Sequence, residues 1–218
     1  MSAVNEGRPG GGGTGSSWIL AWLDRLPPGA RVLDFAAGAG RHARAAAGRG
    51  LSVLAIDRDA DALARCRALE RSGDDFSGAA AAGSAAAQAP ASAGTRRPID
   101  IRVADLEAGP WPFGADERFD AVIVANYLFR PRFVLLAALV APGGFLIYET
   151  FARGNEAFGR PSNPAYLLDA GELLVRARQA GLTILDYATG LVPGASPALI
   201  QRLCAIRATG AAAAIALS

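Results

Sequence analysis

The sequence predicts an α/β fold in which a mostly parallel, doubly wound sheet of seven strands ends in an antiparallel hairpin. Short apolar runs alternate with segments of helical periodicity, which is typical of strands joined by helical crossovers. The last two runs, residues 182–191 and 199–207, are separated only by a short turn. These two strands must pair antiparallel, because a parallel crossover needs about a dozen residues.

The predicted domain covers residues 17–207, because a chain of 218 residues suffices for one core of ordinary size. Residues 1–16, which contain a run of glycines, and residues 208–218 are expected to be flexible tails. Residues 71–98 consist mostly of Ala, Gly and Ser, so we expect a flexible insertion of low complexity.

The first predicted helix covers residues 17–26, where large apolar side chains recur at helical spacing before Pro27 and Pro28 end it. Its two tryptophans, Trp18 and Trp22, are expected either to pack against the sheet or to lie over a ligand cleft.

A buried strand over residues 32–35 then leads into a small-residue turn at residues 36–40 and a helix over 41–48. Small residues let backbone N–H groups approach a ligand, so we expect a ligand at this turn. The turn also satisfies the G-x-G-x-x-A fingerprint of dinucleotide-binding folds. Asp34 at the strand end would repel a pyrophosphate and attract a cationic or amine-bearing ligand.

The second strand, residues 51–57, ends on Asp57, about 20 residues beyond the glycine turn. A carboxylate at that distance can accept hydrogen bonds from both ribose hydroxyls of an adenosine. Asp59 is expected to cap the next helix. A third strand follows at residues 98–103.

The fourth strand covers residues 118–126, and a helix over 133–141 leads through a turn at 142–144 into a fifth strand over 145–149. Asn126 and Tyr127 therefore lie at the carboxyl edge of the sheet, where open α/β folds bind their ligands. The polar, aromatic-containing loop after the fifth strand is expected to act as a lid on the substrate side. A last helix is expected to start near Asp169 and end at Gly181.

The stretch Asp34-Phe-Ala-Ala-Gly-Ala-Gly40 resembles the D-x-G-x-G-x-G motif of class I S-adenosylmethionine-dependent methyltransferases, which share the Rossmann-like sheet with a terminal hairpin. APGGFLIYET, at residues 141–150, is similar to the segment around the fifth strand of that family. A weaker similarity of the loop and of Asn126-Tyr127 is to bacterial methyltransferases of the tellurite-resistance type. Ala36 replaces the first glycine, so its backbone is expected to avoid positive φ.

The resemblance implies S-adenosylmethionine as cofactor and methyl transfer to a small polar acceptor. In that family an acid just past the third strand accepts the adenine amino group, a position that Asp105 and the apolar Leu106 occupy here. The cofactor-binding residues implied are Asp34, Ala36, Gly38, Gly40, Asp57, Arg58, Asp105, Leu106 and Asn126.

Asn126, Tyr127 and Glu149 are the candidate catalytic residues. Glu149, Tyr127 or His42 could accept a proton from a hydroxyl or ammonium nucleophile, although a structural role is favoured for His42. The candidate substrate-binding residues are Arg130, Asn155, Phe158 and Arg160. The two arginines indicate an acceptor with an oxyanion, and the alternative is that they pair with Glu149 and Glu156 to stiffen the loop.

The composition favours neither nucleic acid nor a metal ion as a partner, so we expect a small-molecule substrate. All 22 basic residues are arginines, they are scattered, and 20 acids leave a net charge of +2, so nucleic acid is not expected as a partner. Cys66 and Cys204 lack metal-ligand spacing, so no metal site is expected. The absence of a secretory signal or a membrane-spanning stretch predicts a cytoplasmic protein. We also expect it to be a monomer or dimer. An NAD(P)-dependent oxidoreductase and a non-catalytic cofactor-binding protein remain alternatives.

Overall fold

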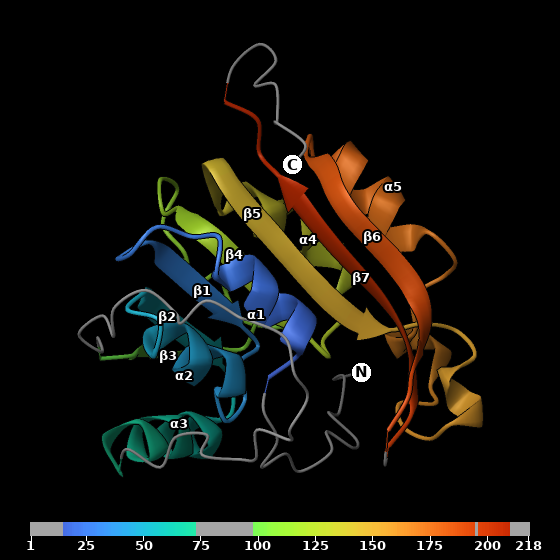
Figure 1. Cartoon of the computed structure of the whole chain (residues 1–218), viewed down its shortest axis with the longest axis horizontal. Helices are drawn as coiled ribbons and strands as arrows, with labels where there is room; N and C mark the ends of the chain where they lie inside the picture. The colour runs from blue at the N-terminus through green and yellow to red at the C-terminus, as the bar shows by residue number, and fades with distance from the viewer. Residues whose placement is uncertain (1–14, 73–97, 195, 210–218) are drawn as a thin grey trace, which may run out of the picture.

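A computed structural model describes residues 15–72, 98–194 and 196–209, which form one mixed sheet flanked by helices (Figure 1). The strand order is β3-β2-β1-β4-β5-β7-β6, and β7 runs antiparallel to both of its neighbours. The strands are β1 (Arg31–Phe35), β2 (Ser52–Asp57), β3 (Asp100–Val103), β4 (Phe119–Ala125), β5 (Val140–Phe151), β6 (Thr183–Val192) and β7 (Ala198–Ile206). This architecture confirms the predicted fold class.

The helices divide between the two faces of the sheet. One face carries α1 (Ser17–Leu23), α2 (Arg41–Ala47) and α3 (Ala60–Ser72), and the other carries α4 (Phe133–Ala138) and α5 (Glu172–Gln179) (Figure 1). Three short 3₁₀ helices are η1 (Arg130–Arg132), η2 (Asn155–Ala157) and η3 (Pro164–Tyr166). Because successive side chains of a strand point to opposite faces, the apolar strands supply both cores at once.

The crossover from β3 to β4 contains no helix. Trp111 and Phe113 pack there against Phe35, with ring centroids 6.1 and 6.2 Å away. An aromatic loop therefore covers the carboxyl end of β1 on the face that α4 and α5 cover elsewhere.

Several boundaries differ from the predicted ones. Residues 142–144 lie inside β5 as an irregularity and not as a turn before it, and Gly144 is required because a Cβ there would lie 2.8 Å from the Asp120 carbonyl oxygen. The last helix is capped by Gly171, in the left-handed region, and not by the side chain of Asp169.

The predicted tails and insertion fall largely outside the described residues. Within 1–16, the structure describes only Gly15, which is buried, and Ser16, which caps α1. The insertion was placed at 71–98, yet α3 continues to Ser72 and Ile99 is buried directly after Pro98. No helix in the described part of the chain is long and apolar enough to cross a membrane.

The carboxyl edge of the sheet has a topological switch point between β1 and β4. The chain leaves β1 toward β2 and leaves β4 toward β5, so the two crossovers diverge at this edge. In open α/β sheets such divergence forms the crevice that binds the ligand, so a ligand is expected here. We call the carboxyl ends of β1, β2 and β3 the cofactor half of this edge, and those of β4 and β5 with the adjoining β7 and β6 the acceptor half, after the ligands that the sequence predicts for them.

Candidate functional site

Asp57 holds the glycine turn in place. Its Oδ2 accepts a hydrogen bond of 2.7 Å from the Gly38 N–H, and its Oδ1 accepts one of 3.0 Å from the Asp59 N–H. These two hydrogen bonds fix the carboxylate of Asp57 at the carboxyl end of β2. Asp59 caps α3 as predicted, because its side chain accepts from the Ala62 N–H.

Asp34 is buried beneath the turn, with 2% of its surface exposed. Its Oδ2 accepts a hydrogen bond of 2.9 Å from the Ala43 N–H in the first turn of α2. The carboxylate thus occupies the helix end at which a dinucleotide fold would bind a pyrophosphate.

The turn has left-handed backbone at three of its five residues. Gly38, Gly40 and also Ala36, with φ of 59°, have positive φ, so the expectation that Ala36 avoids this region was wrong. The turn geometry outweighs the steric cost, which is about 1 to 2 kcal/mol for a residue with a Cβ. Gly40 is also required sterically, because a Cβ there would lie 2.1 Å from the Cys66 Sγ in α3.

Asp105 follows β3 and organises its own loop. Its Oδ1 accepts hydrogen bonds from the Glu107 and Ala108 N–H groups, which lower the pKa of its carboxyl. Leu106 beside it is buried, and Arg58 is exposed and contributes a smaller electrostatic effect on Asp105. Asp105 is thus an ionised acceptor one strand away from Asp57.

Asn126 and Tyr127 follow β4 and contact different parts of the molecule. Asn126 adopts positive φ and donates its backbone N–H to the Glu149 carbonyl oxygen at 2.9 Å. The Tyr127 ring packs against Phe35, and its hydroxyl lies near Glu107 and Asp105 in the cofactor half. Burial raises the pKa of Tyr127, so the neutral phenol is a poor proton acceptor.

Glu149 lies at the carboxyl end of β5 and is 9% exposed. Its Oε2 accepts a hydrogen bond of 2.9 Å from the Ser16 hydroxyl, and the Arg202 Nε lies 3.9 Å from the same oxygen. Burial raises the pKa of Glu149 despite these contacts. The Ser16 N–H donates to the His42 Nε2 at 3.1 Å, so residue 16 links the residues that follow β1 to the end of β5.

Sequence reasoning missed Ser16 and Arg202. Arg202 is the cross-strand partner of Glu149 in the β5–β7 register, and no local motif encodes that register. The two tryptophans of α1 differ in their contacts. Trp22 is buried against Phe145, while Trp18 lies in the acceptor half beside Arg202.

Arg130 has a structural environment that differs from both sequence interpretations. Its guanidinium pairs with both carboxylate oxygens of Glu172 and donates to the carbonyl oxygens of Ala165 and Leu167. It therefore ties the loop to α5 and does not pair with Glu149 or Glu156.

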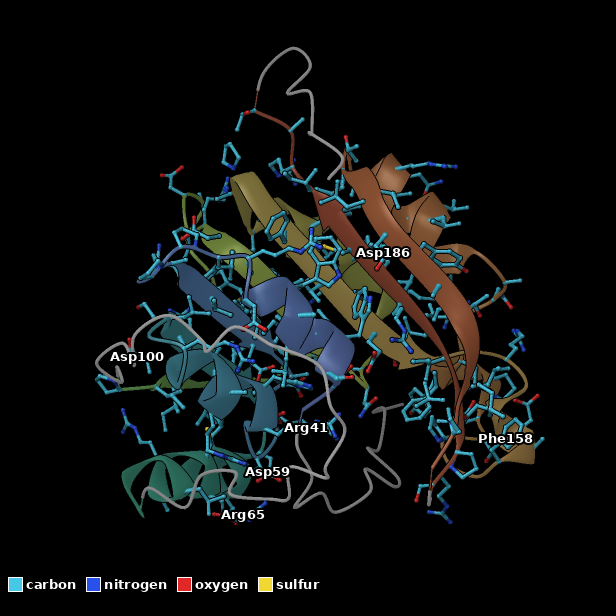
Figure 2. All side chains as sticks on the ribbon, in the orientation of Figure 1. Arg41, Asp59, Arg65, Asp100, Phe158 and Asp186 are labelled. Carbon is cyan, nitrogen blue, oxygen red and sulfur yellow. The ribbon has the colours of Figure 1, made fainter. Side chains whose placement is uncertain are left out.

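The other three predicted substrate residues lie on the loop after β5. Asn155 is buried and holds the loop to β7, since its Oδ1 accepts from the Leu199 N–H and its Nδ2 donates to the Pro161 carbonyl oxygen. Arg160 is exposed, and Phe158 is 44% exposed. Figure 2 places Phe158 near the outer end of β6 and β7, well to the side of Arg41 at the start of α2. Among the described residues, no hydrogen bond or ion pair joins any of these three side chains to Glu149.

Comparison with solved structures identifies the fold. TehB from Haemophilus influenzae superposes with a TM-score of 0.63 at 13% identity over 89% of this chain, which spans 62% of TehB. Magnesium protoporphyrin IX methyltransferase from Synechocystis PCC 6803, with bound S-adenosylhomocysteine, gives 0.62 at 19% identity over 88% of this chain and 80% of its own. The chain has the methyltransferase fold.

The methyltransferase fold also supports other chemistry, since the [4+2]-cyclase SpnF superposes with a TM-score of 0.60 at 17% identity, covering 88% of this chain and 80% of SpnF. No family model and no curated protein sequence matches the chain significantly. The fold alone does not assign the function, which depends on the residues at the switch point.

Proposed function

We propose that this protein is an S-adenosylmethionine-dependent methyltransferase acting on a small polar acceptor. The observation that carries the proposal is the hydrogen bond from the Ala43 N–H to Asp34. A pyrophosphate at the start of α2 would compete with a buried carboxylate, whereas a cofactor with a sulfonium and an ammonium group gains from it.

The residues at the ends of β2 and β3 fit the adenosine part of that cofactor. Asp57 ends β2 with a carboxylate, the group that can accept from ribose hydroxyls. The Oδ2 of Asp105 takes no hydrogen bond within the described residues, which leaves it for the adenine amino group. Leu106 supplies an apolar surface for the ring face.

S-adenosylmethionine would supply an activated methyl group, so the chain needs mainly to position an acceptor and exclude water. Glu149 is placed to accept a proton from the acceptor, since it is the buried carboxylate next to Asn126 at the switch point. Asn126 and Glu149 therefore remain the catalytic candidates. We assign Tyr127 instead to the cofactor half, where it packs against Phe35.

Calorimetric titration with S-adenosylmethionine, S-adenosylhomocysteine and NAD⁺ tests the proposal. Both adenosyl ligands should bind and NAD⁺ should not. Asp57→Ala should weaken S-adenosylhomocysteine binding about 10- to 150-fold, the effect of losing one charge-assisted bond of about 1.5 to 3 kcal/mol. Asp61→Ala, an exposed acid on α3, is the matched control and should bind normally.

A protein that binds the cofactor without transferring methyl would give the same titrations. Turnover separates the two, measured as acceptor-dependent formation of S-adenosylhomocysteine by mass spectrometry. Binding of NAD⁺ in place of the adenosyl ligands would contradict the proposal and favour the oxidoreductase.

A further inference from the structure

Arg202 is an arginine of the acceptor half whose guanidinium makes no hydrogen bond to the described residues. It lies on β7 directly across from Glu149 on β5. The 3.9 Å between its Nε and the Glu149 Oε2 permits electrostatic attraction but is too long for a hydrogen bond. Within the three described stretches of the chain, its guanidinium donates no hydrogen bond.

Three arginines elsewhere on the sheet differ in this respect. Arg130 has hydrogen bonds to Glu172 and to two carbonyl oxygens, and Arg132 donates to the carbonyl oxygens of Leu106 and Gly109. Arg176 donates to Glu172. A guanidinium has five N–H donors, so Arg202, with 26% of its side chain exposed, can bind a ligand without breaking bonds within the protein.

Trp18 fixes Arg202 beside the crevice. The guanidinium carbon of Arg202 lies 5.6 Å from the centroid of the Trp18 ring, and the indole Nε1 donates a hydrogen bond of 2.9 Å to Asp186. The hydrogen bond sets the orientation of the ring, which in turn supports the cation. Arg202 is therefore positioned in advance of ligand binding.

Ser16 shows that Glu149 accepts hydroxyl hydrogen bonds next to Arg202. The Ser16 hydroxyl donates to Oε2, the oxygen that Arg202 approaches, while Oε1 takes no hydrogen bond within the described residues. An acceptor hydroxyl or amine that donates to Oε1 would have a proton acceptor at one end and the Arg202 guanidinium at the other.

We infer that the acceptor carries both an oxyanion, bound by Arg202, and a hydroxyl or amine nucleophile whose proton passes to Glu149. The inference rests on the proposed function and names its substrate class. A bond forms between the nucleophile and the methyl carbon, and the bond from that carbon to sulfur breaks. The electron pair stays on sulfur, giving S-adenosylhomocysteine, while the O–H or N–H proton goes to the Glu149 carboxylate.

The test uses the full-length protein saturated with S-adenosylhomocysteine. The probes are glycolate, glycine, anthranilate, salicylate and 4-hydroxybenzoate, each paired with its carboxamide. At least one acid should bind tenfold or more tightly than its amide in calorimetry. Arg202→Gln should remove that preference while leaving affinity for S-adenosylhomocysteine within twofold. Arg178→Gln, an exposed arginine on α5, is the control and should keep the preference.

Glu149→Gln separates proton acceptance from binding. With S-adenosylmethionine, it should lower methylation of the preferred acid at least 100-fold, remove the rise of rate with pH, and keep the binding preference. The inference is overturned if no acid binds, if acids and amides bind equally, or if Arg202→Gln keeps the preference. In each case retained binding of S-adenosylhomocysteine leaves the proposed function standing, and its loss would count against that function instead.

Discussion

The two halves of the carboxyl edge differ in what their polar side chains bind. In the cofactor half, Asp34 and Asp57 accept hydrogen bonds from backbone N–H groups that lie within about 20 residues of them. In the acceptor half, Glu149 accepts a hydrogen bond from the Ser16 hydroxyl and forms a long ion pair with Arg202. These residues are 133 and 53 positions away from it. The cofactor half is thus built by local backbone, and the acceptor half by side chains that only the sheet brings together.

This difference has a consequence for mutation. A change in the cofactor half is expected to act through the backbone of a tight turn, so its effect on stability depends on whether the new residue fits that backbone. A change at a carboxylate of the acceptor half acts through charge, so its effect depends on pH.

Gly40→Ala is expected to have the largest effect, because it would place a Cβ 2.1 Å from the Cys66 Sγ at a residue with positive φ. Overpacking together with backbone strain should cost about 3 kcal/mol or more in the free energy of unfolding. Urea denaturation measures the loss. Gly48→Ala, at the other end of α2 and with negative φ, is the control and should change stability by less than about 0.5 kcal/mol.

Glu172→Gln should come next, at about 1 to 2 kcal/mol near neutral pH. Hydrogen bonds from Arg130 and Arg176 outweigh desolvation and lower the pKa of Glu172 to about 2. A lowered pKa stabilises the folded state above about pH 4.5, and this contribution is lost as the pH falls toward 2.

The difference between wild type and Glu172→Gln should therefore shrink between pH 6 and pH 3 in denaturation experiments. Glu156→Gln, an exposed acid on the loop, should change stability little at either pH. An unchanged difference at pH 3 would mean that the ion pairs do not account for the stabilisation.

Glu149→Gln should have a smaller effect of opposite sign. Burial raises the pKa of Glu149, so ionisation costs folding energy as the pH rises above the usual value of 4.5. The amide removes that cost and still accepts the Ser16 hydroxyl. Thermal unfolding should show a gain of about 0.5 to 1 kcal/mol at pH 8 that disappears below about pH 5. A loss of stability at pH 8 would show that attraction to Arg202 dominates.

Ala36→Gly should have the smallest effect, within about 0.5 kcal/mol, because relief of strain at positive φ offsets the added chain entropy of glycine. Ala36→Val should be clearly less stable, since a β-branched residue fits this backbone poorly. Calorimetric unfolding of the pair measures both. Equal stability of the two variants would contradict a backbone origin of the effect.

The same contrast explains what the sequence could predict. The strands, the terminal hairpin and the helix cap at Asp59 depend on short-range patterns, namely apolar periodicity, turn length and capping. The Glu149–Arg202 pair depends on the register of β7 against β5, which no local pattern specifies. The pairing of Arg130 with Glu172 was missed because the two residues lie 42 positions apart.

The placement of two tryptophans gives each half its own optical reporter. Trp111 packs against Phe113 and Phe35 in the cofactor half, and Trp18 lies beside Arg202 in the acceptor half. Indole emission responds to nearby charge, so an anion at Arg202 would shift the fluorescence of Trp18 and leave that of Trp111 nearly unchanged. With Trp22 replaced by phenylalanine, the order in which the two halves fill could be followed in a stopped-flow fluorimeter without any added dye.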